Sequence, residues 1–155
     1  MVWRRVVIGV GNEYRHDDGF GPLVVAALAD RVAGDHRLAG VELRISDGEP
    51  ARMLQAWTGT AITVVIDVAA GHGRTGWQEL ALLEDTEPEP AAASGHGIGL
   101  GTTVELARVL GRLPQRLVTL VAYGKEFGFG VGLSAAVSAA VGPVADRACA
   151  LVAPR

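Results

Sequence analysis

Three side chains of the kinds that bind metal ions follow or precede separate predicted elements of the chain. Asp18 comes soon after one apolar run, Asp67 directly follows another, and His96 precedes a helical pattern. Because the carboxyl ends of parallel strands gather at one edge of a sheet, these groups are able to converge there. Two carboxylates and one imidazole suit a borderline divalent transition metal with coordination positions left open. Each residue alone also has an ordinary explanation, as a helix cap or a solvated loop residue.

Two other histidines compete for the imidazole role. His16 stands beside Asp17 and Asp18, and His72 follows Asp67 by only five residues. The spacing does not choose among His16, His72 and His96, so the roles of the first two stay open.

The turn that carries Asp18 also holds an amide and a second carboxylate. Asn12 is placed to fix the turn through Asx-type hydrogen bonds or to bind substrate backbone, and the structural role is the more usual one. We predict that Asp17 caps the following helix and that Asp18 is the ligand. If this division of roles is correct, Asp17→Asn should have a mild effect and Asp18→Asn a severe effect.

Other chemistries find little support in the sequence. The dinucleotide pattern G-x-G-x-x-G fails at Tyr14, and two acids at a helix N-terminus repel a pyrophosphate. A serine-hydrolase G-x-S-x-G motif is missing. Cys149 lies in an apolar helical run, where a thiol is normally inert. The glycine-rich segment 123–130 is either a mobile substrate loop or a turn with its aromatic residues in the core.

The candidate residues are positioned by alternating strands and helices. The predicted strands are 6–10, 41–45, 62–66, 77–84 and 117–123, and the predicted helices are 20–32, 50–57, 102–110 and 134–152. Continuous β-branched runs such as 62–66 are typical of strands buried on both faces. Strands that alternate with helices predict a three-layer α/β/α sandwich.

Composition narrows the class of protein. A chain of 155 residues with 49% hydrophobic and 20% charged residues fits one folded domain, 1–155. A net charge of −3 without a basic patch argues against nucleic acid as a partner. The single cysteine excludes an internal disulfide and suits the cytoplasm. No apolar run approaches the length of a membrane span, so we expect no membrane insertion.

Five stretches together resemble nickel–iron hydrogenase maturation proteases. The segments 8–12 and 17–21 match the opening motif of this family. Three further segments follow in the family's order, namely 65–67, 94–100 and 127–134. The likeness covers nearly the whole chain, and its first and last motifs are the more specific ones.

The resemblance implies a fold, an activity and a set of site residues. The fold is a twisted, mostly parallel five-stranded sheet between helices. The activity is that of an endopeptidase that removes a C-terminal extension from the hydrogenase large-subunit precursor. Asp18 and Asp67 would be catalytic, and together with His96 they would contact metal. His96 and Asn12 would contact the substrate. Position 18 is often glutamate in the family, so the aspartate here has a shorter reach.

The resemblance also implies that the metal arrives with the substrate. Nickel already inserted in the precursor would serve as the recognition signal, and we expect no tightly bound cofactor and a monomeric protein. Cleavage would use either a metal-polarised carbonyl or metal-bound water, or an acid–base pair of carboxylates. One alternative is a non-catalytic metal-dependent binding module or maturation chaperone on the same scaffold. A weaker one is a stand-alone metallo-hydrolase for small peptides with its own tightly bound metal.

Overall fold

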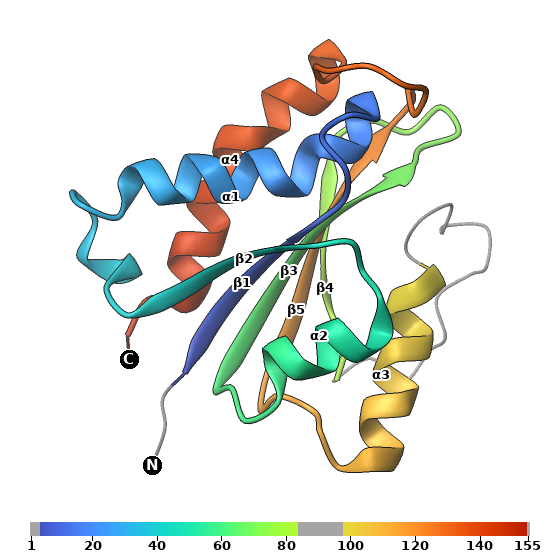
Figure 1. Cartoon of the computed structure of the whole chain (residues 1–155). Helices are drawn as coiled ribbons and strands as arrows, with labels where there is room; N and C mark the ends of the chain where they lie inside the picture. The colour runs from blue at the N-terminus through green and yellow to red at the C-terminus, as the bar shows by residue number, and fades with distance from the viewer. Residues whose placement is uncertain (1–3, 84–97, 155) are drawn as a thin grey trace.

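A twisted five-stranded sheet in the order β2-β1-β3-β5-β4 forms the centre of the computed structural model, which describes residues 4–83 and 98–154 (Figure 1). The strands are β1 (Arg5–Val10), β2 (Val41–Ser46), β3 (Ile62–Ala70), β4 (Trp77–Ala81) and β5 (Leu117–Gly124). Neighbouring strands are parallel except β4, which runs antiparallel to β5. The mostly parallel five-stranded sheet of the prediction is confirmed.

Helices cover both faces of this sheet and complete the predicted three layers (Figure 1). The helices are α1 (Phe20–Arg31), α2 (Pro50–Trp57), α3 (Ile98–Leu110) and α4 (Ala135–Val152), with short 3₁₀ turns η1 (His16–Gly19) and η2 (His36–Leu38). Helices α1 and α4 pack together on one face, and α2 and α3 pack together on the other.

Two apolar clusters fill the spaces between the layers. Val7 and Ile66 point towards α1 and α4. Val6 and Ile8 point the opposite way and pack with Trp57 of α2. Side chains alternate between the faces of a strand, so a strand covered by helices on both sides is apolar throughout. This is why the central strands carry continuous apolar runs.

The N-terminus of α1 lies directly on the backbone of the sheet. A Cβ added at Gly21 would lie 2.6 Å from the carbonyl oxygen of Ile66 and 2.6 Å from the amide nitrogen of Val10. No side chain fits there, because both neighbours are rigid strand backbone. The glycine therefore sets how closely α1, and the turn before it, approach β1 and β3.

Replacing Gly21 with alanine is expected to lower the free energy of unfolding by about 2 kcal/mol or more, the cost of overpacking a rigid site. Urea denaturation followed by circular dichroism measures the change. Gly101→Ala on α3 is the matched control, because a Cβ there meets nothing within 4 Å. That substitution should stabilise the protein by about 0.5–1 kcal/mol. A Gly21→Ala protein as stable as the wild type would contradict the close approach.

Three element boundaries differ from the sequence prediction by more than one residue. Strand β3 continues through Asp67 to Ala70 because β5 pairs with it as far as Ala70–Gly124, so the prediction that Asp67 ends the strand is wrong. Strand β4 ends at Ala81 rather than at 84. Helix α3 begins before 102, and Leu100 packs against the core between α2 and α3. This tertiary contact outweighs the poor helix propensity of the neighbouring glycines.

Helix α4 is the one element among residues 4–83 and 98–154 that is long and apolar enough to cross a membrane. This finding differs from the expectation that no segment reaches that length. One side of the helix packs in the core, where Val144 and Ala148 are fully buried under α1. Cys149 is also fully buried, and burial raises the pKa of its thiol, as expected for an inert packing residue.

Candidate active site

Strands β1 and β3 are neighbours in the sheet, but the helices that connect them to β2 lie on opposite faces. Pairing between β1 and β3 ends at Gly9–Ile66, and Asp67 is the next residue along β3. The chain leaves β1 towards α1 on one face and enters β3 from α2 on the other. In open α/β sheets, such a switch point opens a crevice at the carboxyl ends of the strands. A cavity of about 260 Å³ lies at this point.

Asp18 and Asp67 both line this cavity. Its described walls are Val10, Gly11, Asn12, Asp18, Asp47, Gly48, Met53, Val65, Asp67 and Leu100. Three of these side chains are carboxylates, and within the described part of the wall none is lysine, arginine or histidine. The predicted convergence of Asp18 and Asp67 is therefore found, while their catalytic and metal-binding roles stay predictions.

Asp18 is held by a tight turn and is only 7% exposed. Its Oδ2 accepts the N–H of Asn12 at 3.0 Å, and its own carbonyl oxygen accepts the same N–H at 3.1 Å. Gly11 makes this closure possible, because it adopts φ +142° and a Cβ there would lie 1.9 Å from the Asp18 carbonyl oxygen. The orientation of the Asp18 carboxylate is thus fixed by backbone.

Asp67 reaches the cavity from the middle of a rigid strand. It is 6% exposed and stands opposite Val121 in the β3–β5 ladder. Its Oδ1 accepts the N–H of Val68 at 2.8 Å. Strand pairing on β5 leaves little freedom for this side chain, which is the property that a catalytic or ligating carboxylate needs.

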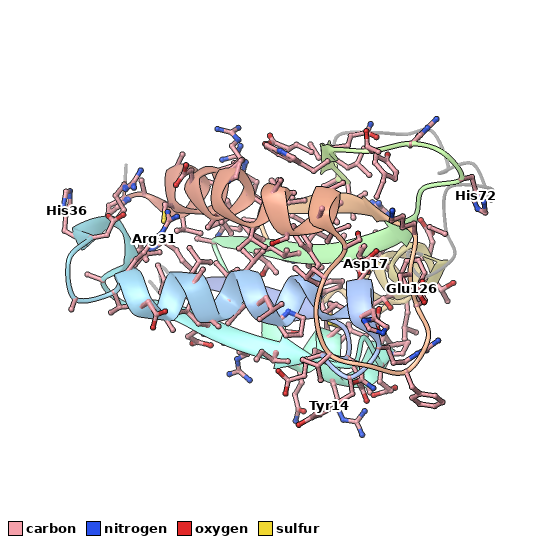
Figure 2. The ribbon with its side chains drawn as sticks, turned by 90° about the horizontal axis from the view of Figure 1, so that it is seen from above. Tyr14, Asp17, Arg31, His36, His72 and Glu126 are labelled. Carbon is pink, nitrogen blue, oxygen red and sulfur yellow. The ribbon has the colours of Figure 1, made fainter. Side chains whose placement is uncertain are left out.

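The structure tests two of the three candidate histidines. His96 lies outside the described residues, so its predicted role as ligand and substrate contact is untested. His16 Nδ1 contacts the Gly132 carbonyl oxygen at 3.0 Å, and His72 is exposed on the loop after β3, away from Asp17 (Figure 2). Neither lines the cavity. Within residues 4–83 and 98–154, no three histidine, cysteine, aspartate or glutamate side chains are grouped to hold a metal ion.

Asn12 fills the structural role that its position predicts. Its Oδ1 accepts the N–H of Tyr14 at 2.9 Å, which closes an Asx turn. Asn12 also lines the cavity. Contact with substrate therefore stays a prediction for this residue.

Asp17 is not a helix cap, so that prediction is wrong. Neither η1 nor α1 has a side-chain cap, and the Asp17 carboxylate points instead into the loop between β5 and α4. Its Oδ2 accepts the backbone N–H groups of Lys125 at 2.9 Å and Glu126 at 3.0 Å. Ser134 donates twice to the carboxylate, from its backbone N–H to Oδ1 at 2.7 Å and from its hydroxyl to Oδ2 at 2.9 Å. Figure 2 shows Asp17 and Glu126 as neighbours.

The pKa of Asp17 reflects its burial and these four hydrogen bonds. Complete burial of the carboxylate acts to raise its pKa, because a low dielectric disfavours the charged form. Hydrogen bonds from Lys125, Ser134 and Glu126 favour the charged form and outweigh burial, so the net pKa lies below the ordinary value of 3.8. Asp17 is therefore a buried anion that holds the glycine-rich loop.

Further contacts fasten the same loop to the turn before α1. The N–H of His16 donates to Gly130 at 2.8 Å, and the N–H of Gly130 donates to Tyr14 at 2.9 Å. The loop is thus tied along its length. Its two aromatic residues behave differently, because Phe127 packs against the core while Phe129 is 93% exposed. Neither interpretation from the sequence, a mobile loop or a loop with both aromatics buried, describes it fully.

Asp47 is a cavity residue that sequence reasoning missed. Its Oδ1 accepts the N–H of Glu49 at 3.0 Å, and its Oδ2 accepts Arg52 Nη1 at 2.8 Å. The Glu49 N–H, aided by the Arg52 guanidinium, holds the pKa of the Asp47 carboxyl below its usual value. In the sequence, Asp47-Gly48 predicts only the end of a strand. The strand order, which places β2 beside β1, is what brings Asp47 to the site.

Neither a protein-family model nor a curated protein matches this sequence, but solved structures do. The hydrogenase maturating endopeptidase HybD from Escherichia coli superposes with a TM-score of 0.75 at 20% identity, over 96% of this chain and 91% of that one. The NiFe hydrogenase maturation protease HybD from Thermococcus kodakarensis gives 0.67 at 23% identity, over 96% and 99%. The endopeptidase HycI from Escherichia coli gives 0.70 at 16% identity, over 95% and 90%.

These similarities extend over nearly the full length of both partners in each comparison. At such low identity they establish the architecture, and the fold implied by the sequence resemblance is confirmed. This chain has the fold of hydrogenase maturation endopeptidases.

Proposed function

We propose that this chain is an endopeptidase that removes a C-terminal extension from a nickel-loaded hydrogenase large-subunit precursor. The observation that carries the proposal is the pairing of Asp18 and Asp67 as nearly buried carboxylates in one cavity at the switch point of the sheet. The likeness of fold to maturation endopeptidases supports the same activity. The protein would act in the cytoplasm as a monomer, with the precursor as its partner.

The charge of the cavity favours a substrate that brings its own cation. Asp18 and Asp67 are nearly buried carboxylates in a small space, and a nearby positive charge stabilises the ionised form of such groups. Nickel held in the precursor would provide that charge when the precursor docks. Asp18 and Asp67 would contact the nickel together with His96, and Asn12 would contact substrate backbone. Precursor without nickel would then bind poorly.

Two chemical routes are open to the pair of carboxylates. In one, the substrate's nickel polarises the scissile carbonyl or activates water, and the carboxylates orient it. In the other, one carboxylate takes a proton from the attacking water and the other delivers a proton to the leaving amine. Both routes need Asp18 and Asp67 fixed in place, which the Gly11 turn and the β3–β5 ladder provide.

Mass spectrometry of the precursor tests the function directly. Nickel-loaded precursor from the same organism should lose its C-terminal extension on incubation with this chain, whereas nickel-free precursor should stay intact. A chaperone or binding module would leave the mass unchanged in both samples. A stand-alone metallo-hydrolase would carry tightly bound metal after purification, whereas we expect metal analysis of the isolated protein to find little.

A further inference from the structure

A second hollow adjoins the acidic cavity. This groove has a volume of about 720 Å³ and lies between β2 and α2, with Arg44 and Ser46 on one wall and Gln55 on the other. The groove and the cavity share Gly11 and Asp47 in their walls. A chain lying in the groove can therefore continue into the cavity that holds Asp18 and Asp67.

The β2 side of the groove is an open sheet edge. Strand β2 is the outermost strand and pairs only with β1 in the described sheet. The N–H of Gly11 donates to the Ser46 carbonyl oxygen at 3.0 Å, so the backbone polar groups of Ser46 face β1. Because these groups alternate in direction along a strand, those of Leu43 and Ile45 face outwards. Such an edge is a template for an added strand.

The charged side chains that line the groove each have an ion-pair partner. Arg44 lies 3.1 Å from Glu42, and Arg52 lies 2.8 Å from Asp47. Because each of these charges already has a partner of opposite sign, attraction of a charged side chain is not the main means of recognition here. The outward main-chain groups of β2 are the chemistry that remains, and they recognise an extended peptide backbone.

We propose that the groove binds the substrate chain next to the scissile bond in an extended conformation, as a strand added to the outer edge of β2. This inference rests on the proposed endopeptidase function and names how its substrate is held. An extended chain advances about 3.3 Å per residue, so the six residues of β2 offer a track of about 20 Å. The shared wall at Gly11 and Asp47 then leads the bound chain to the carboxylates.

A proline scan of the two sheet edges tests the proposal. Ile45→Pro removes one outward N–H, and proline is tolerated on an edge strand where the N–H faces solvent. Ile45→Ala removes most of the same side chain but keeps the N–H. Ala81→Pro removes an outward N–H at the opposite edge, because Leu82 and Gly76 of the β4 chain bond inwards to β5.

We expect Ile45→Pro to raise KM for the nickel-loaded precursor about tenfold, since each lost main-chain hydrogen bond is worth about 1 kcal/mol and the strand alignment suffers as well. Ala81→Pro, at the edge outside the groove, should keep KM within about twofold of the wild type, a change of under 0.5 kcal/mol. Ile45→Ala reports the share of the side chain, and it should raise KM clearly less than Ile45→Pro does. An unchanged KM for a folded Ile45→Pro protein would overturn the proposal. If the wild type trims no precursor, the proposed function itself fails, which is a separate outcome.

Amide hydrogen exchange provides a readout that does not depend on the folding of the proline variant. The probe is a synthetic peptide that spans the cleavage site of the precursor, added with Ni²⁺ and in large excess to an Asp67→Asn protein, because peptide without the metal is expected to bind poorly. The amides of Leu43 and Ile45 should exchange more slowly with peptide present, while that of Ala81 should not change. Equal exchange with and without peptide overturns the proposal. Protection that appears without peptide and grows with protein concentration also overturns it, because the edge then pairs with a second copy.

Discussion

Asparagine at position 67 is expected to lower kcat/KM for precursor trimming by about 10²–10⁴-fold, the range for removing a catalytic proton-transfer group. Asparagine keeps the shape of the side chain and an Oδ1 that can still accept the N–H of Val68. The substitution thus removes the charge while it preserves the strand. Asp18→Asn is expected to lose activity similarly, because it also removes the charge. Its amide oxygen can still accept the N–H of Asn12, so the turn is preserved.

Time courses of precursor mass measure the loss, and urea denaturation shows whether the fold survives. Asp146→Asn is the matched control, since Asp146 is an exposed residue of α4 whose carboxylate pairs with Arg31. Asp47→Asn should have a smaller effect than Asp67→Asn, because Asp47 is 64% exposed and already neutralised by Arg52. Normal trimming by both the Asp18 and the Asp67 variants would remove the site assignment.

The kinetic pattern of these variants separates the two chemical routes. If the carboxylates contact the substrate's nickel, each asparagine variant should bind the precursor more weakly and also turn it over more slowly. If they act only as acid and base, kcat should fall while the affinity for precursor stays near normal. Affinity is measured with the inactive variants and nickel-loaded precursor by calorimetry.

The apolar patterns of the sequence predict most of the architecture because they record burial. Runs such as 62–66 are apolar on both faces only when helices cover both sides, and this is what β3 shows. The order of the strands in the sheet is harder to predict from the sequence than the strands themselves, because it depends on contacts between distant segments. Asp47 was missed for that reason: it joins the site only through the pairing of β2 with β1.

The adjacent acids show the same limit at the scale of one residue. Local sequence gives Asp17 and Asp18 nearly the same environment, so helix capping was a reasonable hypothesis for Asp17. The bonds that decide its role come from Lys125, Glu126 and Ser134, more than a hundred residues away. Strand β3 likewise outlasts its apolar run because β5 supplies partners beyond Asp67. Tertiary hydrogen bonds of this kind leave no periodic signal.

Asp17→Asn is therefore expected to have a severe effect, not the mild effect predicted from the sequence. The effect is a loss of folding stability. The buried carboxylate accepts four hydrogen bonds, and an amide in its place would turn one N–H₂ group towards backbone donors. Hydrogen bonds to a charged group contribute about 1.5–3 kcal/mol each, and a loss of about 3 kcal/mol or more is expected. Urea denaturation at neutral pH measures this change, with the exposed Asp30→Asn on α1 as control.

The pH dependence gives a second test with a definite sign. The folded-state pKa of Asp17 lies below 3.8, so the unfolded chain takes up its proton first as the solution is acidified. The contribution of Asp17 to stability is fully present above about pH 4–5 and is lost as the pH falls through the folded pKa. The difference in unfolding free energy between the wild type and Asp17→Asn should therefore be constant near neutrality and shrink below about pH 4. A difference that stays constant down to pH 2 would show that Asp17 acts by shape alone, without its charge.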